Sequence, residues 1–285
     1  IVTGASGGIG SCVAQKLAQR GYRIVLIARN RDRLAALARQ IHPRPCLAIP
    51  LDLTKPERIA PSLRGLLAEY GPVEVLVNNA GASIYSRFLD QTPQEHERLM
   101  RVNYLAAAEM IRLVLPAMLQ RQRGHIINVA SVAARVGPWG HAGYAAAKAA
   151  LISLTQTLAA EHADEGVHFS YVNPGIVDTP YFRLPDKAPL WRKVRRYAIT
   201  PQRVSDRIVS LLDRPRLELY VPRHFRLIDW LWLIHPRLAH QVVARQSRHA
   251  EADGREAKPA SPIAGLSPPA PPPAQALNQP RLGDL

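Results

Sequence analysis

The chain opens with the glycine-rich turn Thr3-Gly4-Ala5-Ser6-Gly7-Gly8-Ile9-Gly10, which follows the apolar residues Ile1 and Val2. A segment with helical periodicity, Ile9 to Arg20, begins inside this turn. A strand, a glycine turn and a helix in this order are typical of the first unit of a doubly wound sheet. Because a complete strand needs about two or three more residues, we expect a short leader before Ile1.

Apolar runs of strand length alternate with helix-period segments along the rest of the chain. The predicted strands are Arg23 to Ala28, Cys46 to Pro50, Val73 to Asn78, His125 to Val129, Val167 to Asn173 and Glu218 to Val221. The predicted helices are Ile9 to Arg20, Arg31 to Gln40, Pro56 to Tyr70, Gln94 to Gln122, Gly143 to His162 and Pro201 to Leu212. This alternation predicts an α/β fold with a doubly wound parallel (Rossmann) sheet.

Polar residues and glycines stand where each predicted strand ends. They are Gly4, Gly8 and Gly10, then Arg29, Asp52, Asn78-Asn79-Ala80-Gly81, Ser131 and Pro174-Gly175. In such sheets ligands bind at the carboxyl ends of the strands, where the strand order reverses. We therefore expect these residues to line one crevice.

Tyr144 and Lys148 are four residues apart on a predicted helix, so they share a face. A free tyrosine titrates near ~10, and a neighbouring cation stabilises the phenolate and makes the hydroxyl a more useful acid. Together with Ser131 and the glycine turn, the pair indicates an oxidoreductase. Structural readings remain for single residues: Ser131 as a helix cap, Asn103 as a buried hydrogen-bond partner and Tyr144 as a core aromatic.

With these motifs in this order, residues 1 to about 222 resemble the short-chain dehydrogenase/reductase family. The matching residues are Thr3-Gly4-x-x-x-Gly8-Ile9-Gly10, Asn78-Asn79-Ala80-Gly81, Asn103, Ser131, Tyr144-x-x-x-Lys148 and Pro174-Gly175. The glycine spacing differs from the G-x-G-x-x-G fingerprint. Its role is the same, because the glycines let the backbone approach a pyrophosphate whose charge meets the N-terminus of the next helix.

The resemblance implies a role for each catalytic candidate. Tyr144 would donate a proton to the developing alkoxide, and Lys148 would hold the ribose hydroxyls and lower the pKa of Tyr144. Ser131 would orient the carbonyl, and Asn103 would hold a water that links Lys148 to solvent. This is a positioned proton donor with electrostatic stabilisation of an oxyanion, and it requires no metal.

The residues after the second strand favour NADP(H) as the cofactor. Arg29 and Arg31 supply two cations and no acid there, whereas NAD enzymes usually place an acid at this point. Arg29 can stack on adenine and pair with a 2′-phosphate, with Ser6 adding a hydrogen bond; the alternative is a solvated arginine that opens a helix. The full set of predicted cofactor-binding residues, some by resemblance only, is Gly4, Ser6, Gly7, Gly8, Ile9, Gly10, Arg29, Asp52, Asn79, Ala80, Gly81, Tyr144, Lys148, Pro174, Gly175, Val177 and Thr179.

Length and composition predict one core and a tail. With 285 residues, 47% hydrophobic and 21% charged, we expect a catalytic domain over 1–222, an apolar and basic helical extension over 223–250 and a Pro-rich disordered tail over 251–285. The two cysteines, Cys12 and Cys46, lie outside any His or Cys cluster, which favours a reducing, cytoplasmic location without a disulfide framework or metal site. No stretch reaches the ~18 apolar residues of a membrane span.

The net charge of +15 arises from 37 Lys and Arg against 22 Asp and Glu. Nucleic-acid binding is one reading, but no recognition helix or aromatic-basic sheet motif accompanies the charge. An anionic cofactor and an anionic membrane surface explain it better.

Two segments predict an apolar substrate side. By resemblance, the segment between Thr179 and Arg203 forms a lid; its charged residues are Arg183, Asp186, Lys187, Arg192, Lys193, Arg195, Arg196 and Arg203, and Trp191, Val194 and Ala198 have helical spacing. The run Phe225 to Ile234 suits an interfacial helix, so we predict membrane contact through residues 225–248. An equal alternative is that this run packs over the substrate pocket or at a subunit interface.

We therefore predict an NADP-dependent reductase of a ketone or aldehyde, reversible with the alcohol, acting on a hydrophobic or lipid-like small molecule. Within the fold, the alternative reactions are reduction of an activated double bond and epimerisation. The alternatives of another class are a non-catalytic NADP-binding regulatory protein and a nucleic-acid binder. The helices from Gln94 and Gly143 resemble the family's pairing surfaces, which predicts a homodimer or tetramer.

Overall fold

The structure is a computed structural model that describes residues 1–183, 191, 192, 194–239, 241, 243 and 244. The predicted tail of residues 251–285 lies outside the described residues. So do Asp186, Lys187 and Lys193 of the predicted lid.

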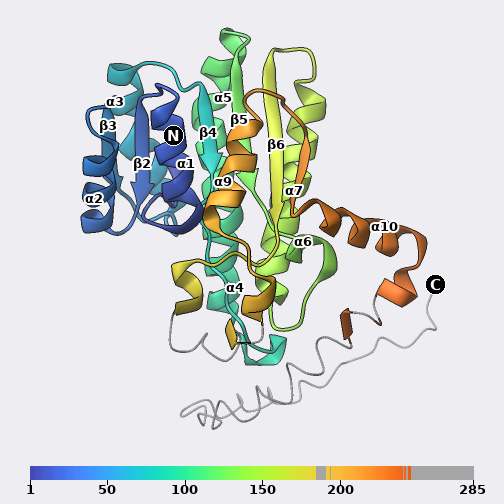
Figure 1. Cartoon of the computed structure of the whole chain (residues 1–285). Coiled ribbons are helices and arrows are strands. Elements are labelled where there is room, and N and C mark those ends of the chain that lie inside the picture. The colour runs from blue at the N-terminus through green and yellow to red at the C-terminus, as the bar shows by residue number, and fades with distance from the viewer. Residues whose placement is uncertain (184–190, 193, 240, 242, 245–285) are drawn as a thin grey trace, which may run out of the picture.

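A seven-stranded sheet forms the centre of the fold, with the order β3-β2-β1-β4-β5-β6-β7 and parallel pairing throughout (Figure 1). The strands are β1 (Val2–Thr3), β2 (Ile24–Ala28), β3 (Cys46–Pro50), β4 (Val75–Asn78), β5 (Gly124–Val129), β6 (Val167–Pro174) and β7 (Glu218–Val221). The order reverses between β1 and β4. The prediction of a doubly wound parallel sheet is confirmed, and each predicted strand lies within about two residues of its place.

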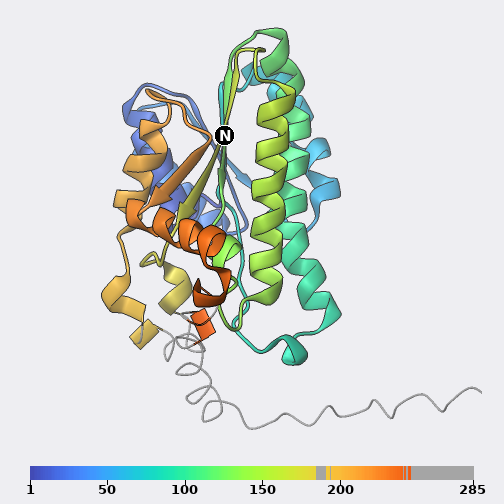
Figure 2. The ribbon, with the colours of Figure 1, turned by 90° about the vertical axis from the view of Figure 1, so that its right-hand side faces the viewer.

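Helices cover both faces of the sheet (Figure 2). One face carries α1 (Gly8–Gln19), α2 (Arg31–Ile41) and α9 (Pro201–Ser210). The other carries α3 (Ile59–Tyr70), α4 (Pro93–Met100), α5 (Ala106–Gln120) and α7 (Ala142–Glu161). Two further helices, α6 (Ala133–Val136) and α10 (Arg226–Ile234), lie near the carboxyl ends of β5, β6 and β7.

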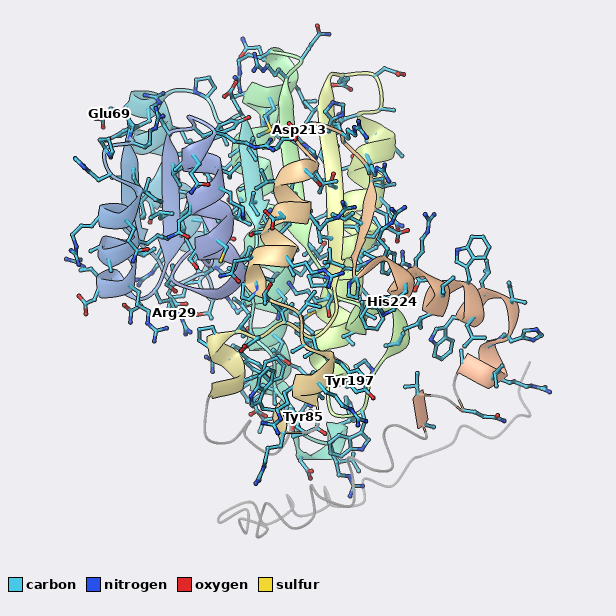
Figure 3. All side chains as sticks on the ribbon, viewed as in Figure 1. Arg29, Glu69, Tyr85, Tyr197, Asp213 and His224 are labelled. Carbon is cyan, nitrogen blue, oxygen red and sulfur yellow. The ribbon has the colours of Figure 1, made fainter. Side chains whose placement is uncertain are left out.

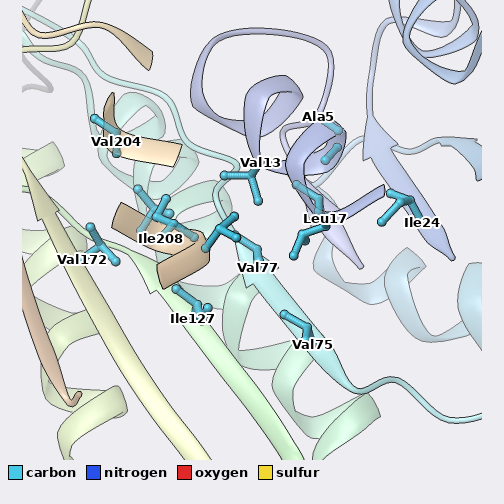
Figure 4. Packing of buried hydrophobic residues seen from close by; sticks show 14 of the residues in the cluster. Ala5, Val13, Leu17, Ile24, Val75, Val77, Ile127, Val172, Val204 and Ile208 are labelled. Atoms are coloured by element: carbon cyan, nitrogen blue, oxygen red, sulfur yellow. The ribbon is translucent and has the colours of Figure 1, made fainter. Parts of the chain in front are cut away.

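The strands are apolar on both faces because helices cover both. In β4 every residue is buried, and a strand buried on two sides reads as a continuous apolar run. On one face, Val13 and Leu17 of α1 meet Val77, Ile127 and Ile208 in one hydrophobic cluster (Figure 4). This core holds the strands in register and so fixes where their carboxyl ends lie.

The predicted single helix from Gln94 to Gln122 is divided by a π-helical turn, Arg101–Leu105. Its first part begins at Thr92, whose side chain forms a capping box with Glu95. Within the π turn, Asn103 Nδ2 donates to Leu99 O at 3.0 Å. In a regular helix the backbone N–H of Asn103 would donate to Leu99 O. Here the Asn103 side chain donates to that carbonyl. Single π turns are common at functional sites.

One helical span in the described residues, Pro93–Gln120, is long and apolar enough by composition to cross a membrane. Half of its most apolar window is buried inside the fold, as in the core helix of a globular domain. In the lid, Trp191 and Arg192 are helical, and Arg195–Tyr197 forms a 3-10 turn.

Candidate active site

One large cavity of about 1240 Å³ opens at the carboxyl ends of the strands. Pockets for one ligand usually measure ~300–1,000 Å³, so this volume has room for a dinucleotide and a second molecule. Figure 3 shows Arg29 and Tyr85, which line it, at this end of the sheet, with Glu69 and Asp213 at the other end. Of the predicted site residues, those that line the cavity are Gly4, Ser6, Gly7, Gly8, Ile9, Arg29, Asp52, Asn79, Ala80, Gly81, Ser131, Tyr144, Lys148, Pro174, Gly175, Val177 and Thr179.

Two predicted site residues, Gly10 and Asn103, lie behind the cavity wall. A Cβ on Gly10 would collide with Gly4 O and Asn79 Nδ2, so glycine lets α1 pack closely against the end of β1. Asn103 is buried, and its amide exchanges two hydrogen bonds with the backbone of Ala82, at 3.2 and 2.9 Å. Both residues therefore shape the wall.

Helix α7 brings Tyr144 and Lys148 to the floor of the cavity beside Ser131. Lys148 is only 3% exposed, and its Nζ donates to Val129 O, at the end of β5, at 2.7 Å. Ser131 Oγ accepts a hydrogen bond from Ala133 N at 3.1 Å, but the N-cap of α6 is Val132, so Ser131 is not the helix cap. The three side chains come together from two elements that the sheet and its covering helix hold in place.

The pKa values of these groups are shifted by burial. Burial lowers the pKa of the Lys148 ammonium to about 8, which is close to neutral pH. Burial raises the pKa of Tyr144, with a smaller lowering from its hydrogen bond to Ser131 and a further raising by Tyr181. The predicted lowering of the Tyr144 pKa by Lys148 is therefore absent from this structure. The physical reason is that the desolvation of the phenolate outweighs the interactions that favour it.

The first turn of α1 forms an anion site in the cavity wall. Gly7 precedes the helix without a side-chain cap, and no acidic residue occupies the first turn. Gly7, Gly8 and Ile9 all line the cavity, so their exposed backbone N–H groups and the positive helix end face it. These residues fit a pyrophosphate.

The end of the cavity next to β2 is cationic. Arg29 and Arg33 line it, whereas the predicted second cation, Arg31, does not. Asn30 caps α2 by accepting from Arg33 N at 2.8 Å, which sets Arg33 one turn beyond Arg29. Burial alone would raise the pKa of Asp52, but hydrogen bonds from Thr54 and the charges of Arg29 and Lys55 hold it below its usual value. This end fits a phosphate with a hydrogen-bond acceptor beside it.

The two asparagines at the end of β4, Asn78 and Asn79, join strands at the switch point. Asn79 Nδ2 donates to Thr3 O at 3.0 Å, and Asn79 N donates to Thr3 Oγ1 at 2.9 Å. Asn78 Nδ2 donates to Asn128 Oδ1 at 2.9 Å. These bonds tie the carboxyl ends of β1, β4 and β5 together.

Sequence analysis missed an aromatic group on the substrate side. The Tyr85 ring lies 5.1 Å from the rings of Trp139 and His141, and His141 lies 6.0 Å from Tyr144. His141 stands three residues before Tyr144, so helical spacing was a usable signal for it. Tyr85 and Trp139 come from separate loops and carried no such signal.

A second group of lining residues is apolar. Its residues come from the α6 segment, the lid and the C-terminal extension: Val132, Val136, Phe182, Val194, Phe225, Ile228, Leu231 and Trp232. In the described part of the chain, no group of three or more His, Cys, Asp or Glu could hold a metal ion.

Comparison with known proteins gives a consistent result. A family model for short chain dehydrogenases matches residues 1–187. An uncharacterized oxidoreductase of Staphylococcus epidermidis is 34% identical over 215 residues, which cover 75% of this chain and 90% of the relative. A short-chain dehydrogenase from Sphingobium yanoikuyae in complex with NADPH is 29% identical with a TM-score of 0.72, and the match covers 91% of this chain and 97% of that one. A metagenomic short-chain oxidoreductase in complex with NADP is 34% identical with a TM-score of 0.66, and covers 77% and 94%.

Proposed function

Because this chain belongs to the short-chain dehydrogenase/reductase family, we propose that it uses NADPH to reduce a ketone or aldehyde, reversibly with the corresponding alcohol. The chain is an oxidoreductase of this family. One observation carries the proposal: a single cavity holds the anion site of α1, the cations Arg29 and Arg33, and the side chains of Ser131, Tyr144 and Lys148.

The cofactor, when bound, supplies the hydride. In the proposed reaction the Ser131 hydroxyl donates a hydrogen bond to the substrate carbonyl and holds it beside Tyr144. The Tyr144 hydroxyl then gives its proton to the oxygen as negative charge develops there. Because burial raises its pKa, this hydroxyl is a weaker acid than a free tyrosine, so the transfer depends on the negative charge that develops on the substrate oxygen.

Lys148 is proposed to bind ribose hydroxyls and to resupply the proton. Its lowered pKa of about 8 supports the second role, since an ammonium with this pKa releases a proton far more readily than an ordinary lysine. Asn103 is proposed to hold the water that connects Lys148 to solvent. Its Oδ1 accepts one hydrogen bond, from Ala82 N, which leaves one acceptor position for a water.

NADPH rather than NADH is proposed on the basis of Arg29 and Arg33. The two guanidinium groups line the cavity next to β2, where an NAD enzyme places an acid. The complexes of the Sphingobium and metagenomic proteins with NADPH and NADP agree with this choice. Asp52, Val177 and Thr179 line the same cavity and are proposed to contact the adenine and carboxamide groups.

The proposed substrate is hydrophobic or lipid-like. Support comes from the apolar wall that α10 and the lid add to the cavity. We also propose peripheral membrane contact through residues 225–248, in part outside the described residues. The outward face of α10 exposes Leu227, Trp230 and Leu233, and Arg223 and Arg226 are exposed beside them. Apolar and basic residues together suit an anionic membrane surface.

A homodimer or tetramer is proposed through α7 and the α4–α5 span. On α7, Ala146, Ala149 and Ser153 are exposed at helical spacing. Such small outward residues allow another helix to approach closely.

The test is NADPH oxidation with a panel of ketones and aldehydes graded from short to long-chain and steroid-like. Tyr144→Phe should bind NADPH almost normally and lose turnover, by at least about 100-fold. Tyr70→Phe, at the end of α3, is the matched control and should keep full activity. Turnover retained by Tyr144→Phe would refute the assigned acid. Tight NADPH binding by the unaltered protein without turnover of any carbonyl would favour the regulatory alternative.

A further inference from the structure

Helix α10 presents three distinct faces. Ile228, Leu231 and Trp232 line the cavity. Leu227, Trp230, Leu233 and Ile234 point outward, and Leu233 is 86% exposed. The third face carries Arg226 and Asp229, which are three residues apart and meet charged or polar groups of the core.

Apolar contacts attach α10 to the core only in part, since Ile228, Leu231 and Trp232 are half-buried. None of its nine residues is fully buried. An isolated helix shorter than ~12–15 residues is marginal in water, so this one needs an external attachment to stay helical. One apolar contact is evident before its first turn, where the Phe225 ring packs so closely on Gly175 that a Cβ there would clash.

A polar cluster supplies the other attachment. Tyr220, in β7, donates its hydroxyl hydrogen to Asp229 Oδ2. Arg135 Nε, in α6, lies 3.5 Å from the same oxygen as an ion pair without hydrogen-bond geometry. Arg226, at the start of α10, lies 3.9 Å from Glu218 of β7, but it is 66% exposed and therefore contributes little. Asp229 is the central anchor.

The cluster is itself fixed to the sheet. Arg135 Nη2 donates to Glu218 Oε1 at 3.2 Å and to Tyr171 OH at 3.1 Å. Tyr171 OH donates to Glu218 Oε1 at 2.8 Å and accepts from Gln156 Nε2 at 3.1 Å. Strands β6 and β7 and helices α6 and α7 therefore all support the arginine that faces Asp229.

Arg135 also links this attachment to the chemistry. Helix α6 starts two residues after Ser131, and Val132 and Val136 of this segment line the cavity. Helices α6 and α10 pack against each other. The ion pair between Arg135 and Asp229 therefore holds two parts of the apolar lining together.

We propose that Asp229, held by Tyr220 and Arg135, is a positioning residue that keeps α10 closed as the far wall of the substrate pocket and so sets a preference for long apolar substrates. This inference rests on the proposed function for its substrate, but the closure of α10 does not. Asp229 does not line the cavity, so it acts through Ile228, Leu231 and Trp232. A short carbonyl compound needs only the end of the pocket near Tyr144, whereas a long one must also contact α10.

Burial makes the ionised form of Asp229 less favourable. Burial raises its pKa, the charge of Arg135 lowers it, and the charge of Glu218 raises it again. Asp229→Asn removes the charge that faces Arg135 and weakens the bond from Tyr220, so it should release the helix.

The experiment uses Asp229→Asn in the full chain and two independent measurements. Hydrogen exchange of the peptide that covers α10 should accelerate by about tenfold or more, since a hydrogen bond to a charged group is worth at least that factor. In turnover assays, KM for long apolar ketones should rise by a similar factor, with KM and kcat for a short ketone unchanged. Tyr220→Phe removes the hydroxyl alone and should give a smaller change in the same direction.

The matched control is Asp213→Asn, which breaks an ion pair with Arg20 at the other end of the sheet (Figure 3). This variant should change neither the hydrogen exchange of α10 nor the dependence of KM on the length of the ketone. Unchanged exchange of α10 in Asp229→Asn would overturn the proposal. Faster exchange with equal changes in KM for short and long ketones would overturn the assigned role in specificity. If the unaltered protein reduced no carbonyl, the proposed function would fail, and the exchange result would still decide whether Asp229 holds α10.

Discussion

Replacing Lys148 with methionine should make the folded chain more stable while it removes turnover. Lys148 is buried, and the cause of its lowered pKa is desolvation. The fall from 10.5 to about 8 spans ~2.5 units, and each unit corresponds to about 1.4 kcal/mol, so the buried ammonium costs the folded state about 3 kcal/mol. Methionine has a similar length and no charge. It loses the hydrogen bond to Val129 O, which offsets about 1 kcal/mol and leaves a net gain of about 2 kcal/mol.

The gain should depend on pH in a defined direction. Below about pH 8 Lys148 is protonated in the folded and unfolded states, so the unaltered protein carries the full cost. Between about pH 8 and 10.5 the folded protein releases the proton while the unfolded chain keeps it, so the cost falls as pH rises. Above 10.5 both states are neutral and the cost is gone. The advantage of Lys148→Met should therefore be largest at neutral pH and shrink toward pH 10.5.

The measurement is urea unfolding of the cofactor-free protein, followed by far-ultraviolet circular dichroism at neutral and alkaline pH. Lys16→Met serves as the control, because Lys16 is partly exposed and pairs with Asp206 at 2.6 Å. That variant should show no gain in stability at neutral pH, because it only loses the pair with Asp206. If Lys148→Met were destabilised equally at every pH, the ammonium would not be buried at a cost, and the proton-resupply role would lose its physical basis.

Two further predictions concern the cofactor and the membrane. Arg29→Asp should raise KM for NADPH by about tenfold or more and leave KM for NADH nearly unchanged, because a carboxylate repels the 2′-phosphate. The control is Arg31→Asp, since Arg31 does not line the cavity. Equal losses with both cofactors would contradict the role of Arg29. Leu233→Asp should weaken co-sedimentation with anionic vesicles by several fold, because it places a charge on the outward face of α10. Leu89→Asp, at another exposed leucine, should leave co-sedimentation unchanged. Equal binding by the unaltered protein and both variants would exclude contact through this face.

The sheet could be predicted from the sequence because its signal is local. Each strand is a short apolar run between turn residues, and burial on two faces makes such runs continuous. The same locality explains why the strand-end residues were found: a chain that leaves a parallel strand must place its next residues at one edge of the sheet. Gly4, Asp52 and Ser131 could be assigned to one crevice for that reason alone.

Other features depend on contacts between distant residues. In the sequence, Asp229 is the one acidic residue within the apolar run Phe225 to Ile234, and its anchoring role needs Arg135, 94 positions away, and Tyr220. The raised pKa of Tyr144 is caused by burial, which the spacing to Lys148 does not report. Arg33 was missed, although its spacing of four from Arg29 was available once Asn30 was taken as the helix cap.

The π turn at Arg101–Leu105 makes this site sensitive to the length of the chain as well as to its composition. The turn accommodates one residue more than the same rotation of a regular helix, so the residues after it keep their face toward the sheet. Deleting one residue there would regularise the helix and leave the stripe of Met110, Val114 and Met118 on the sheet that it covers. Asn103, inside the turn, would lose its place beside Ala82. A single missing codon in this turn would therefore damage the site and spare the core, whereas a replacement at the exposed Leu105 would be tolerated.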